Sequence, residues 1–344
     1  MTPRETVLAQ INHETTDPVP FTLYFEGDVE ERLNQHYGNT TWREKLPPYI
    51  ISCGGFDRRR SDPISDTHNR DLFGSVWRTD LRPFHLEEPG LKTPSLEGYD
   101  FPDAKAFENP KLKETAEMTR EEQPDSFTTI GMGWGLWETY WGIRGFEDAM
   151  MDCVAEPDFF AEVLDRLTDL YLAQVEQCAD VQADAIMFGD DWGEQRGVMI
   201  GPDRWREFMK PRYARIYEAV HAQGKLTISH CCGSVADIMP DIIEIGLDVL
   251  ESVQPEAAGM NPYELKARWG DTITFWGCLG SQSTIPFGTP ATIHEEVARL
   301  KHEMGKDGGY ILAPAKALQP ETPTENAVAV YEAFTSRTDL KENP

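Results

Sequence analysis

The stretch Leu226–Gly233, LTISHCCG, joins a short apolar run to a group of reactive side chains. Leu226–Ile228 has the apolar, β-prone character of a buried strand, and a histidine and two cysteines follow it closely. The same arrangement recurs along the chain. The five successive strand ends that carry reactive residues are Gly189–Gly193, Ser229–Gly233, Glu251–Pro255, Gly277–Gln282 and Ala313–Lys316. Such ends meet at the catalytic mouth of a (β/α)8 barrel, whereas a doubly wound sheet concentrates them at one switch point, so the sequence predicts an α/β fold of the TIM-barrel type.

The regular part of the pattern begins near Phe127. Short apolar runs alternate there with helix-length amphipathic segments, as expected for βα units around a parallel sheet. The predicted strands are 128–132, 185–188, 226–228, 247–250, 272–276 and 310–312, and the predicted helices lie near 156–180, 202–222, 235–245, 261–268, 290–305 and 323–336. We therefore expect one barrel domain over residues 1–344, with regular βα units in 121–340.

The first 120 residues are less regular. They contain a helical opening at Arg4–His13, an apolar strand-like run at Val19–Phe25, and a long polar stretch at Arg58–Lys105 that is rich in proline, aspartate and glycine. We expect this irregular N-terminal region to cover one mouth of the barrel.

The composition excludes several classes of partner. The chain has 59 acidic and 32 basic residues and a formal net charge of -27, which repels nucleic acids and anionic membranes. The sequence starts without a cationic region followed by an apolar one, and no apolar run is long enough to span a bilayer, so we expect a cytoplasmic protein. Six cysteines, of which Cys231 and Cys232 are adjacent, do not form the pattern of a disulfide framework, so free or metal-bound thiols are expected.

The paired cysteines raise the possibility of a metal site. Side chains alternate along a strand, so His230 and Cys232 project to one side and Cys231 to the other. Zinc accepts imidazole and thiolate ligands, and a catalytic zinc site needs a third protein ligand and an open position. By softness Cys278 is the preferred third ligand, with Asp190, Asp191 and Glu251 as harder alternatives. The competing interpretation is a hydrogen-bonded barrel histidine among small buried cysteines.

Other strand ends supply further candidates. Asp191 and Asp190 follow a strand directly and are predicted catalytic carboxylates, although adjacent acids also cap helices. Lys316 is a candidate anion-binding or Schiff-base lysine.

Aromatic residues suggest a binding mouth. Trp134 and Trp137 lie in the glycine-rich segment Gly131–Glu138 and, with Gln254 at another strand end, are predicted to bind a cofactor, although aromatic clusters are more often core. Phosphate-loop, dinucleotide and serine-hydrolase motifs are absent from the sequence.

Five segments together resemble one family. They are Met1–Phe21, Phe188–Tyr213, His230–Asp271, Phe287–Ile293 and Gly308–Asn326. In these segments the chain resembles the uroporphyrinogen decarboxylase superfamily, and in particular its methyltransferase-like branch, whose fold is a (β/α)8 barrel.

The resemblance also implies roles for particular residues. In the methyltransferase branch a His-x-Cys pair and a later cysteine bind zinc, which activates a thiol to accept methyl from a methylated corrinoid. The pair corresponds to His230 and Cys232, but Lys316 stands where the later cysteine is expected. The decarboxylase binds its acidic substrate through N-terminal arginines, and the matching segment Phe21–Asp28 has none. Porphyrinogen decarboxylation is therefore disfavoured.

The sequence thus predicts a zinc-dependent methyltransferase. It would move a methyl group between a small substrate, or a thiol or folate acceptor, and a corrinoid such as methylcobalamin, carried by a partner protein or bound transiently. The resemblance makes a homodimer plausible. A decarboxylase or other lyase of a small acid, with Lys316 as anion clamp and Asp191 as proton donor, is the second hypothesis, and a non-catalytic corrinoid- or tetrapyrrole-binding barrel is the third.

Overall fold

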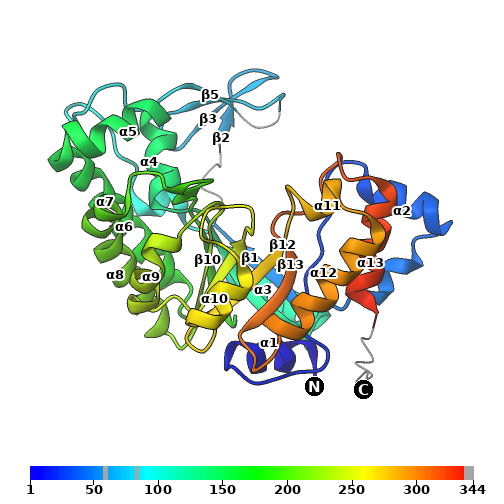
Figure 1. Ribbon diagram of the computed structural model, residues 1–344. Helices are drawn as coiled ribbons and strands as arrows, with labels where there is room; N and C mark the ends of the chain where they lie inside the picture. The colour runs from blue at the N-terminus through cyan, green and yellow to red at the C-terminus, as the bar shows by residue number, and fades with distance from the viewer. Residues whose placement is uncertain (57–60, 82–84, 337–344) are drawn as a thin grey trace.

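A curled parallel sheet forms the centre of the computed structural model, which describes residues 1–56, 61–81 and 85–336 (Figure 1). Its seven strands lie in the order β1-β6-β7-β10-β11-β12-β13, which is also their order in the chain. Their bounds are β1 Ile50–Gly55, β6 Phe127–Trp134, β7 Ala185–Gly189, β10 Leu226–His230, β11 Val249–Val253, β12 Thr274–Leu279 and β13 Tyr310–Pro314. Every neighbouring pair is parallel, so all seven carboxyl ends lie at one edge.

Helices connect the strands and cover the sheet from outside, as βα units require. The helices are α1 Pro3–Ile11, α2 Val29–Tyr37, α3 Leu112–Glu122, α4 Leu136–Arg144, α5 Phe146–Ala155, α6 Pro157–Gln177, α7 Pro202–Arg204, α8 Lys210–His221, α9 Met239–Glu244, α10 Pro262–Trp269, α11 Thr284–Phe287, α12 Pro290–Arg299 and α13 Thr324–Thr335. Turns of 3-10 or π-helix are η1 Thr41–Lys45, η2 Ala104–Phe107, η3 Trp205–Met209, η4 Ala236–Ile238 and η5 Leu300–Met304. None of the helices in the described residues combines the length and apolar character needed to cross a membrane.

All six strands predicted from Phe127 onward are present, but the first part of the barrel differs from the prediction. Strand β1 was not predicted, and the run Val19–Phe25 forms two isolated bridges instead of a strand. Phe21 pairs with Leu312 of β13, and Phe25 pairs with Leu318. Pro20 has no amide hydrogen to donate to a ladder, which limits pairing in this run. Of the predicted (β/α)8 barrel, the described residues therefore show a curled parallel sheet of seven strands with an extended segment beside β13.

The polar stretch that follows β1 forms a separate small sheet. Its antiparallel strands are β2 Ser61–Pro63, β3 His68–Asp71, β4 Val76–Arg78 and β5 His85–Glu88, and a two-stranded ribbon, β8 Gly193–Glu194 with β9 Gly197–Val198, follows β7. Residues 58–60 and 82–84 of the predicted polar stretch lie outside the described residues. Ser75 Oγ donates a hydrogen bond to the carbonyl oxygen of Gly142, so the four-stranded sheet packs on α4 beyond the carboxyl end of β6 (Figure 1).

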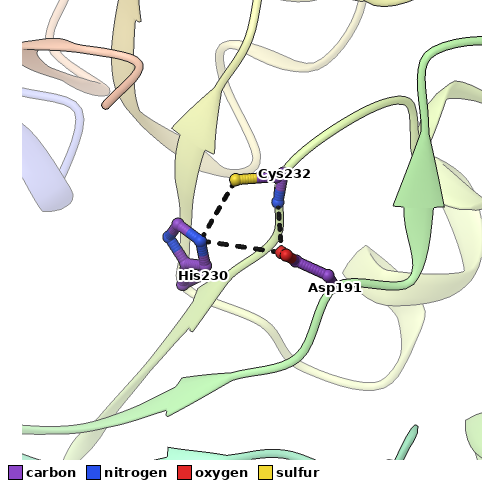
Figure 2. A group of neighbouring side chains, drawn as sticks. All are labelled: Asp191, His230 and Cys232. Atoms are coloured by element: carbon purple, nitrogen blue, oxygen red, sulfur yellow. Dashed lines mark hydrogen bonds and ion pairs between the residues drawn. The ribbon is translucent and has the colours of Figure 1, made fainter. Parts of the chain in front are cut away.

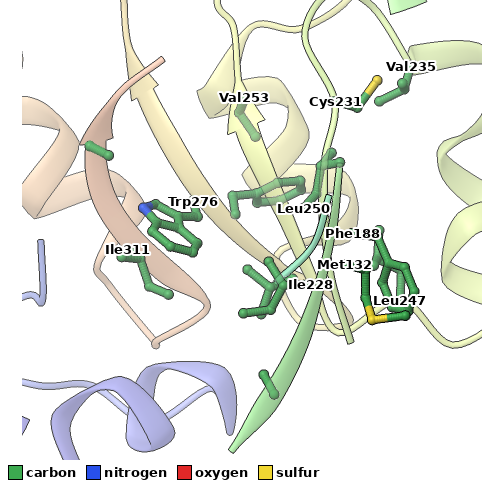
Figure 3. Close-up of a cluster of buried hydrophobic side chains, with 14 of the residues drawn as sticks. Met132, Phe188, Ile228, Cys231, Val235, Leu247, Leu250, Val253, Trp276 and Ile311 are labelled. Carbon is green, nitrogen blue, oxygen red and sulfur yellow. The ribbon is translucent and has the colours of Figure 1, made fainter. Parts of the chain in front are cut away.

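One hydrophobic cluster extends from Val7 to Phe334 and joins the strands to the helices. Figure 3 shows part of it, where Met132, Ile228 and Leu250 from three strands lie together with Trp276 and Ile311. Strands β12 and β13 are buried at every position, because side chains on both faces are covered. This burial explains why the strands appear in the sequence as continuous apolar runs and not as alternating patterns.

Candidate metal centre

Asp191, His230 and Cys232 meet at the carboxyl edge of the sheet (Figure 2). His230 is the last residue of β10 and pairs with Gly189, the last residue of β7, so the loops after the two strands begin side by side. One potential ligand atom from each of the three residues lies within 4.8 Å of the others. His230 Nε2 is 3.3 Å from Cys232 Sγ and 3.6 Å from Asp191 Oδ1. Parallel pairing thus brings Asp191 next to residues about forty positions away.

Glu251 fixes the orientation of the His230 ring. The two residues are register partners on β10 and β11, and Glu251 Oε2 is hydrogen-bonded to His230 Nδ1. Because Glu251 binds Nδ1, Nε2 is the ring nitrogen that faces Cys232 and Asp191. A carboxylate behind a histidine is the usual arrangement around metal-binding imidazoles, where it fixes the tautomer and increases the basicity of the ligand.

The other two side chains are held by the backbone of the same loops. Asp191 Oδ1 accepts a hydrogen bond of 2.7 Å from the amide of Cys232, which ties the loop after β7 to the loop after β10. Gly233 has a φ of +77° and packs so closely that an added Cβ would lie 2.7 Å from the amide nitrogen of Glu194. A glycine is therefore required directly after Cys232, and the sequence HCCG provides it.

The titratable groups of the site shift each other's pKa values. Burial lowers the pKa of His230, but the charge of Glu251 and the hydrogen bonds with Cys232 and Glu251 outweigh burial, so the net pKa is well above the ordinary value. Burial, and next the charges of Asp190 and Asp191, raise the pKa of Glu138 to about 9. Glu138 lies in the first turn of α4, where acids are common in any helix, so the sequence did not distinguish it.

The donor set fits a zinc ion. It consists of an imidazole nitrogen, a thiol sulfur and a carboxylate oxygen, all of which zinc accepts. Three protein ligands with room for a fourth, exchangeable ligand are typical of catalytic zinc sites, whereas structural sites have four protein ligands. Among the described residues, these three side chains lie close enough together to share one ion, and Cys278 is not one of them.

The structure places Asp190 and Asp191 in different roles. The Asp190 carboxylate is fully buried and accepts hydrogen bonds from the amides of Trp137 and Glu138, at 3.1 and 2.8 Å. It also accepts from the Tyr213 hydroxyl at 2.6 Å and from Trp192 Nε1 at 2.7 Å. Asp190 therefore caps the N-terminus of α4, while Asp191 is part of the triad. Burial, opposed by these hydrogen bonds, raises the pKa of Asp190 to about 6.

The remaining cysteines near the mouth lie within the protein core. Cys278 on β12 is 1% exposed, and burial raises the pKa of its thiol. Cys231 projects away from the triad, as strand alternation predicted, and its sulfur accepts a hydrogen bond of 3.2 Å from the amide of Trp192. Both cysteines are free thiols in this structure. The ordering of candidate ligands by softness therefore pointed to Cys278, while the geometry brings Asp191 to the site.

The predicted cofactor-binding residues are separated by the structure. Trp134 borders a cavity of about 400 Å³ at the carboxyl end of β6, whereas Trp137 is 1% exposed and contacts Phe160 in the core. Gln254 is buried behind the metal loop, where its side-chain oxygen accepts a hydrogen bond of 3.1 Å from the amide of Gly233. Lys316 is exposed after β13.

Comparisons with known proteins agree on one family. The family model described as uroporphyrinogen decarboxylase (URO-D) matches residues 80–337. A methylcobamide:CoM methyltransferase, MtaA of Methanosarcina barkeri, is 26% identical over 227 residues, which are 65% of this chain and 62% of that protein. A uroporphyrinogen decarboxylase of Anaeromyxobacter sp. (strain Fw109-5) is 29% identical over 192 residues, 56% of this chain and 52% of that protein. The matched regions thus span between half and two thirds of these relatives.

A solved structure shares the fold. The methyltransferase from Methanosarcina mazei superimposes with a TM-score of 0.70 at 22% sequence identity, over 97% of this chain and 98% of that one. The agreement over nearly the whole length of both chains shows a common architecture.

Proposed function

Because the chain belongs to the uroporphyrinogen decarboxylase (URO-D) family, we propose that it is a zinc-dependent methyltransferase that moves a methyl group between a small substrate, or a thiol or folate acceptor, and a corrinoid. The observation that carries this proposal is the Asp191, His230 and Cys232 donor set at the carboxyl edge of the sheet. The methyltransferase among the relatives adds support. In this proposal the extended segment beside β13 completes a closed (β/α)8 barrel within one domain, residues 1–344.

Zinc at the triad would supply Lewis-acid chemistry, which holds a thiol or alkoxide as its anion near neutral pH. Neighbouring residues orient the side chains that would hold the ion. Glu251 keeps Nε2 of His230 free to act as a ligand, and the Cys232 amide positions the Asp191 carboxylate. With its pKa of about 9, Glu138 holds a proton at pH 7 beside Asp191 and can donate a hydrogen bond to a heteroatom arriving at the triad.

The alternative functions receive less support from the site. A decarboxylase would use Lys316 as an anion clamp and Asp191 as proton donor, but Lys316 is exposed after β13 and Asp191 accepts a hydrogen bond from the amide of Cys232. The mouth also carries carboxylates, because Asp191 belongs to the triad and Glu251 lies behind His230. These charges favour a neutral or cationic substrate over an acid.

The corrinoid in this proposal is carried by a partner protein or is bound transiently. Trp134 borders the cavity at the carboxyl end of β6, and in this proposal it contacts a ligand there. Trp137 and Gln254 are buried and instead support the loops that hold the triad. A homodimer remains a prediction from the family resemblance.

A methyl-transfer assay tests the proposal. Zinc-loaded protein is incubated with methylcobalamin and, in turn, a panel of thiols, amines and tetrahydrofolate. We expect loss of the methylcobalamin absorbance together with a methylated product, both of which the His230→Ala variant abolishes and the Cys278→Ser variant retains. The proposal is wrong if zinc-loaded wild-type protein transfers no methyl to any acceptor in the panel.

A further inference from the structure

The extended segment beside β13 places an aromatic side chain in the open mouth of the sheet. The segment bridges in parallel to β13 and the residues after it, so its later residues lie nearer to the carboxyl edge of the strands. Thr22 is 7% exposed, whereas Tyr24, two residues later, is 56% exposed. The carbonyl oxygen of Tyr24 accepts a hydrogen bond of 2.9 Å from the amide of Leu318, which fixes the backbone at this position. Tyr24 therefore combines a fixed backbone with an open side chain, at the edge that carries the metal triad.

The neighbour that follows Tyr24 shows which way the Tyr24 side chain points. The Phe25 ring packs 5.5 Å from the ring of Trp42, and Trp42 contacts Tyr331 of the outer helix α13. Phe25 therefore points away from the interior of the sheet. Because side chains alternate along an extended chain, Tyr24 points to the opposite side, toward the interior.

Thr22 lies two positions before Tyr24 and therefore on the same side of the segment. Its Oγ1 accepts a hydrogen bond of 2.9 Å from Nε1 of Trp276 on β12 (Figure 3). Trp276 is the register partner of Glu251, and Glu251 is the register partner of His230. Register partners project from the same face of a sheet, so the Trp276 side chain lies on the face that carries His230. Tyr24 is thus the next residue beyond the buried Thr22 and Trp276 pair, on the face that carries the triad.

The hydroxyl of Tyr24 is suited to donate a hydrogen bond to a ligand. Protein flanks the open side chain, and this partial desolvation, followed by the charge of Glu251, raises the pKa of Tyr24, so the phenol keeps its proton at neutral pH. Among the described residues, no hydrogen bond engages this hydroxyl. Carboxylates such as those of Glu251 and Asp191 only accept hydrogen bonds when they are ionised. A substrate oxygen in this mouth therefore finds a donor at Tyr24.

We propose that Tyr24 contacts the substrate, and that its hydroxyl donates a hydrogen bond to an oxygen at the end of the substrate that points away from the triad. The heteroatom that takes part in methyl transfer lies at the triad, and Tyr24 selects the group attached to it. The site then prefers small substrates that carry a neutral, oxygen-bearing group. This inference rests on the proposed function, because it takes the bound molecule to be the substrate of that site.

Pairs of small thiols test the inference, since their sulfur can bind the zinc while their other end reaches toward Tyr24. The pairs are 2-mercaptoethanol with 1-propanethiol, and 3-mercapto-1-propanol with 1-butanethiol, and in each pair a methyl group replaces the hydroxyl. Isothermal titration calorimetry of the zinc-loaded, full-length protein gives the affinity ratio within each pair. In at least one pair, Tyr24→Phe should weaken the hydroxyl compound relative to its partner by roughly two- to tenfold, the effect of one lost hydrogen bond.

Two controls separate a contact with the ligand from a structural effect. Tyr263→Phe removes a hydroxyl that is bonded to Glu296 on the outer helices, and it should leave both ratios at their wild-type values. Zinc content should be equal in wild type and both variants, because neither tyrosine belongs to the triad. Tyr24→Leu, which also removes the hydroxyl, repeats the comparison, and circular dichroism checks the folding of each variant.

The inference is overturned if folded Tyr24→Phe and Tyr24→Leu proteins show the wild-type ratio in both pairs, or weaken both members of each pair equally. A ratio that depends on Tyr24 in a protein without methyl transfer would contradict the proposed function alone. Methyl transfer by a protein whose ratios do not depend on Tyr24 would contradict this inference alone. Protein that binds no zinc would contradict both, because the sulfur would then have no anchor.

Discussion

His230 makes two kinds of contact through its two ring nitrogens. Nδ1 is bonded to the Glu251 carboxylate, whereas Nε2 faces Cys232 and Asp191. This division of roles makes the histidine a ligand held in one tautomer. The role of Glu251 can therefore be separated from the roles of the three donor residues.

Glu251→Gln tests this separation. The amide keeps the shape of the side chain but removes the charge that holds the proton on Nδ1, so zinc affinity should fall roughly tenfold to a hundredfold while the fold is retained. Competition with a chromogenic chelator measures the affinity. Glu256→Gln is the matched control, because Glu256 bonds Gln282 and Ser283 at the same edge of the sheet, away from the triad. Equal zinc affinity in Glu251→Gln and wild type would contradict the assigned role.

Part of this site was predictable from the sequence. Strand alternation was sufficient to predict that His230 and Cys232 project to one side and Cys231 to the other. For the third member, ligand softness favoured Cys278 over Asp190, Asp191 and Glu251, because softness ranks side chains without locating them. Strand register determines which residue is the third member. Gly189 pairs with His230, and this pairing brings the loop that carries Asp191 alongside Cys232. Register depends on long-range pairing that one sequence does not display.

At the scale of elements, Asp190 joins β7 to α4. It accepts hydrogen bonds from two amides in the first turn of the helix, and it also holds Tyr213 and Trp192. The position that precedes α4 is Gly135, which has no side chain to cap the helix. A carboxylate from another strand takes over the capping role and thereby fixes the helix that carries Glu138.

Asp190→Ala should therefore lower the free energy of unfolding by about 3–5 kcal/mol, because it leaves several buried donors without an acceptor. Asp190→Asn, which keeps one acceptor oxygen, should cost less. Chemical denaturation measures both values. Asp203→Ala is the control, since that carboxylate is exposed on α7 and its ion pair with Arg206 contributes little. A loss as small as that of the control would show that Asp190 does not anchor α4.

Lys301 anchors the last helix in a similar way. Its ammonium group donates hydrogen bonds to the carbonyl oxygens of Ala333, Phe334 and Ser336, at 2.7, 3.1 and 3.2 Å, at the end of α13. Burial lowers its pKa from 10.5 to about 8. Between these pH values the unfolded chain binds more protons than the folded one, so the contribution of Lys301 to stability should rise with pH.

The stability difference between wild type and Lys301→Met should accordingly grow from pH 8 towards pH 10.5. Urea denaturation at a series of pH values follows the difference. Lys306→Met, at an exposed lysine close by, provides the control and should show no such growth. A difference that stays constant or shrinks with rising pH would refute the assignment.

The elements themselves were predictable where the pattern was strong. The sequence predicted the six strands of the large sheet from β6 onward, because buried parallel strands appear as continuous β-prone segments. Strand β1 was missed because two glycines close the sequence IISCGG, which makes it a weak strand signal. The run Val19–Phe25 had the stronger signal but forms bridges only, since Pro20 cannot donate to a ladder.

At the scale of the whole molecule, the charge balance is the dominant feature. A formal net charge of -27 on 344 residues means that like charges repel one another over the surface. Salt screens this repulsion, so the melting temperature should rise when NaCl increases from about 0.02 to about 0.5 M. Differential scanning calorimetry measures the change. A melting temperature that is constant or falls with NaCl would show that net repulsion does not limit stability.

The metal content of the purified protein tests the central claim most directly. Inductively coupled plasma mass spectrometry of protein prepared without chelators should find about one zinc per chain in wild type. His230→Ala, Cys232→Ser and Asp191→Ala should each lose most of it, whereas Cys278→Ser should keep it, because Cys278 lies outside the triad. Folded wild-type protein that contains no zinc, or a Cys278→Ser variant that loses zinc while Asp191→Ala retains it, would contradict the account.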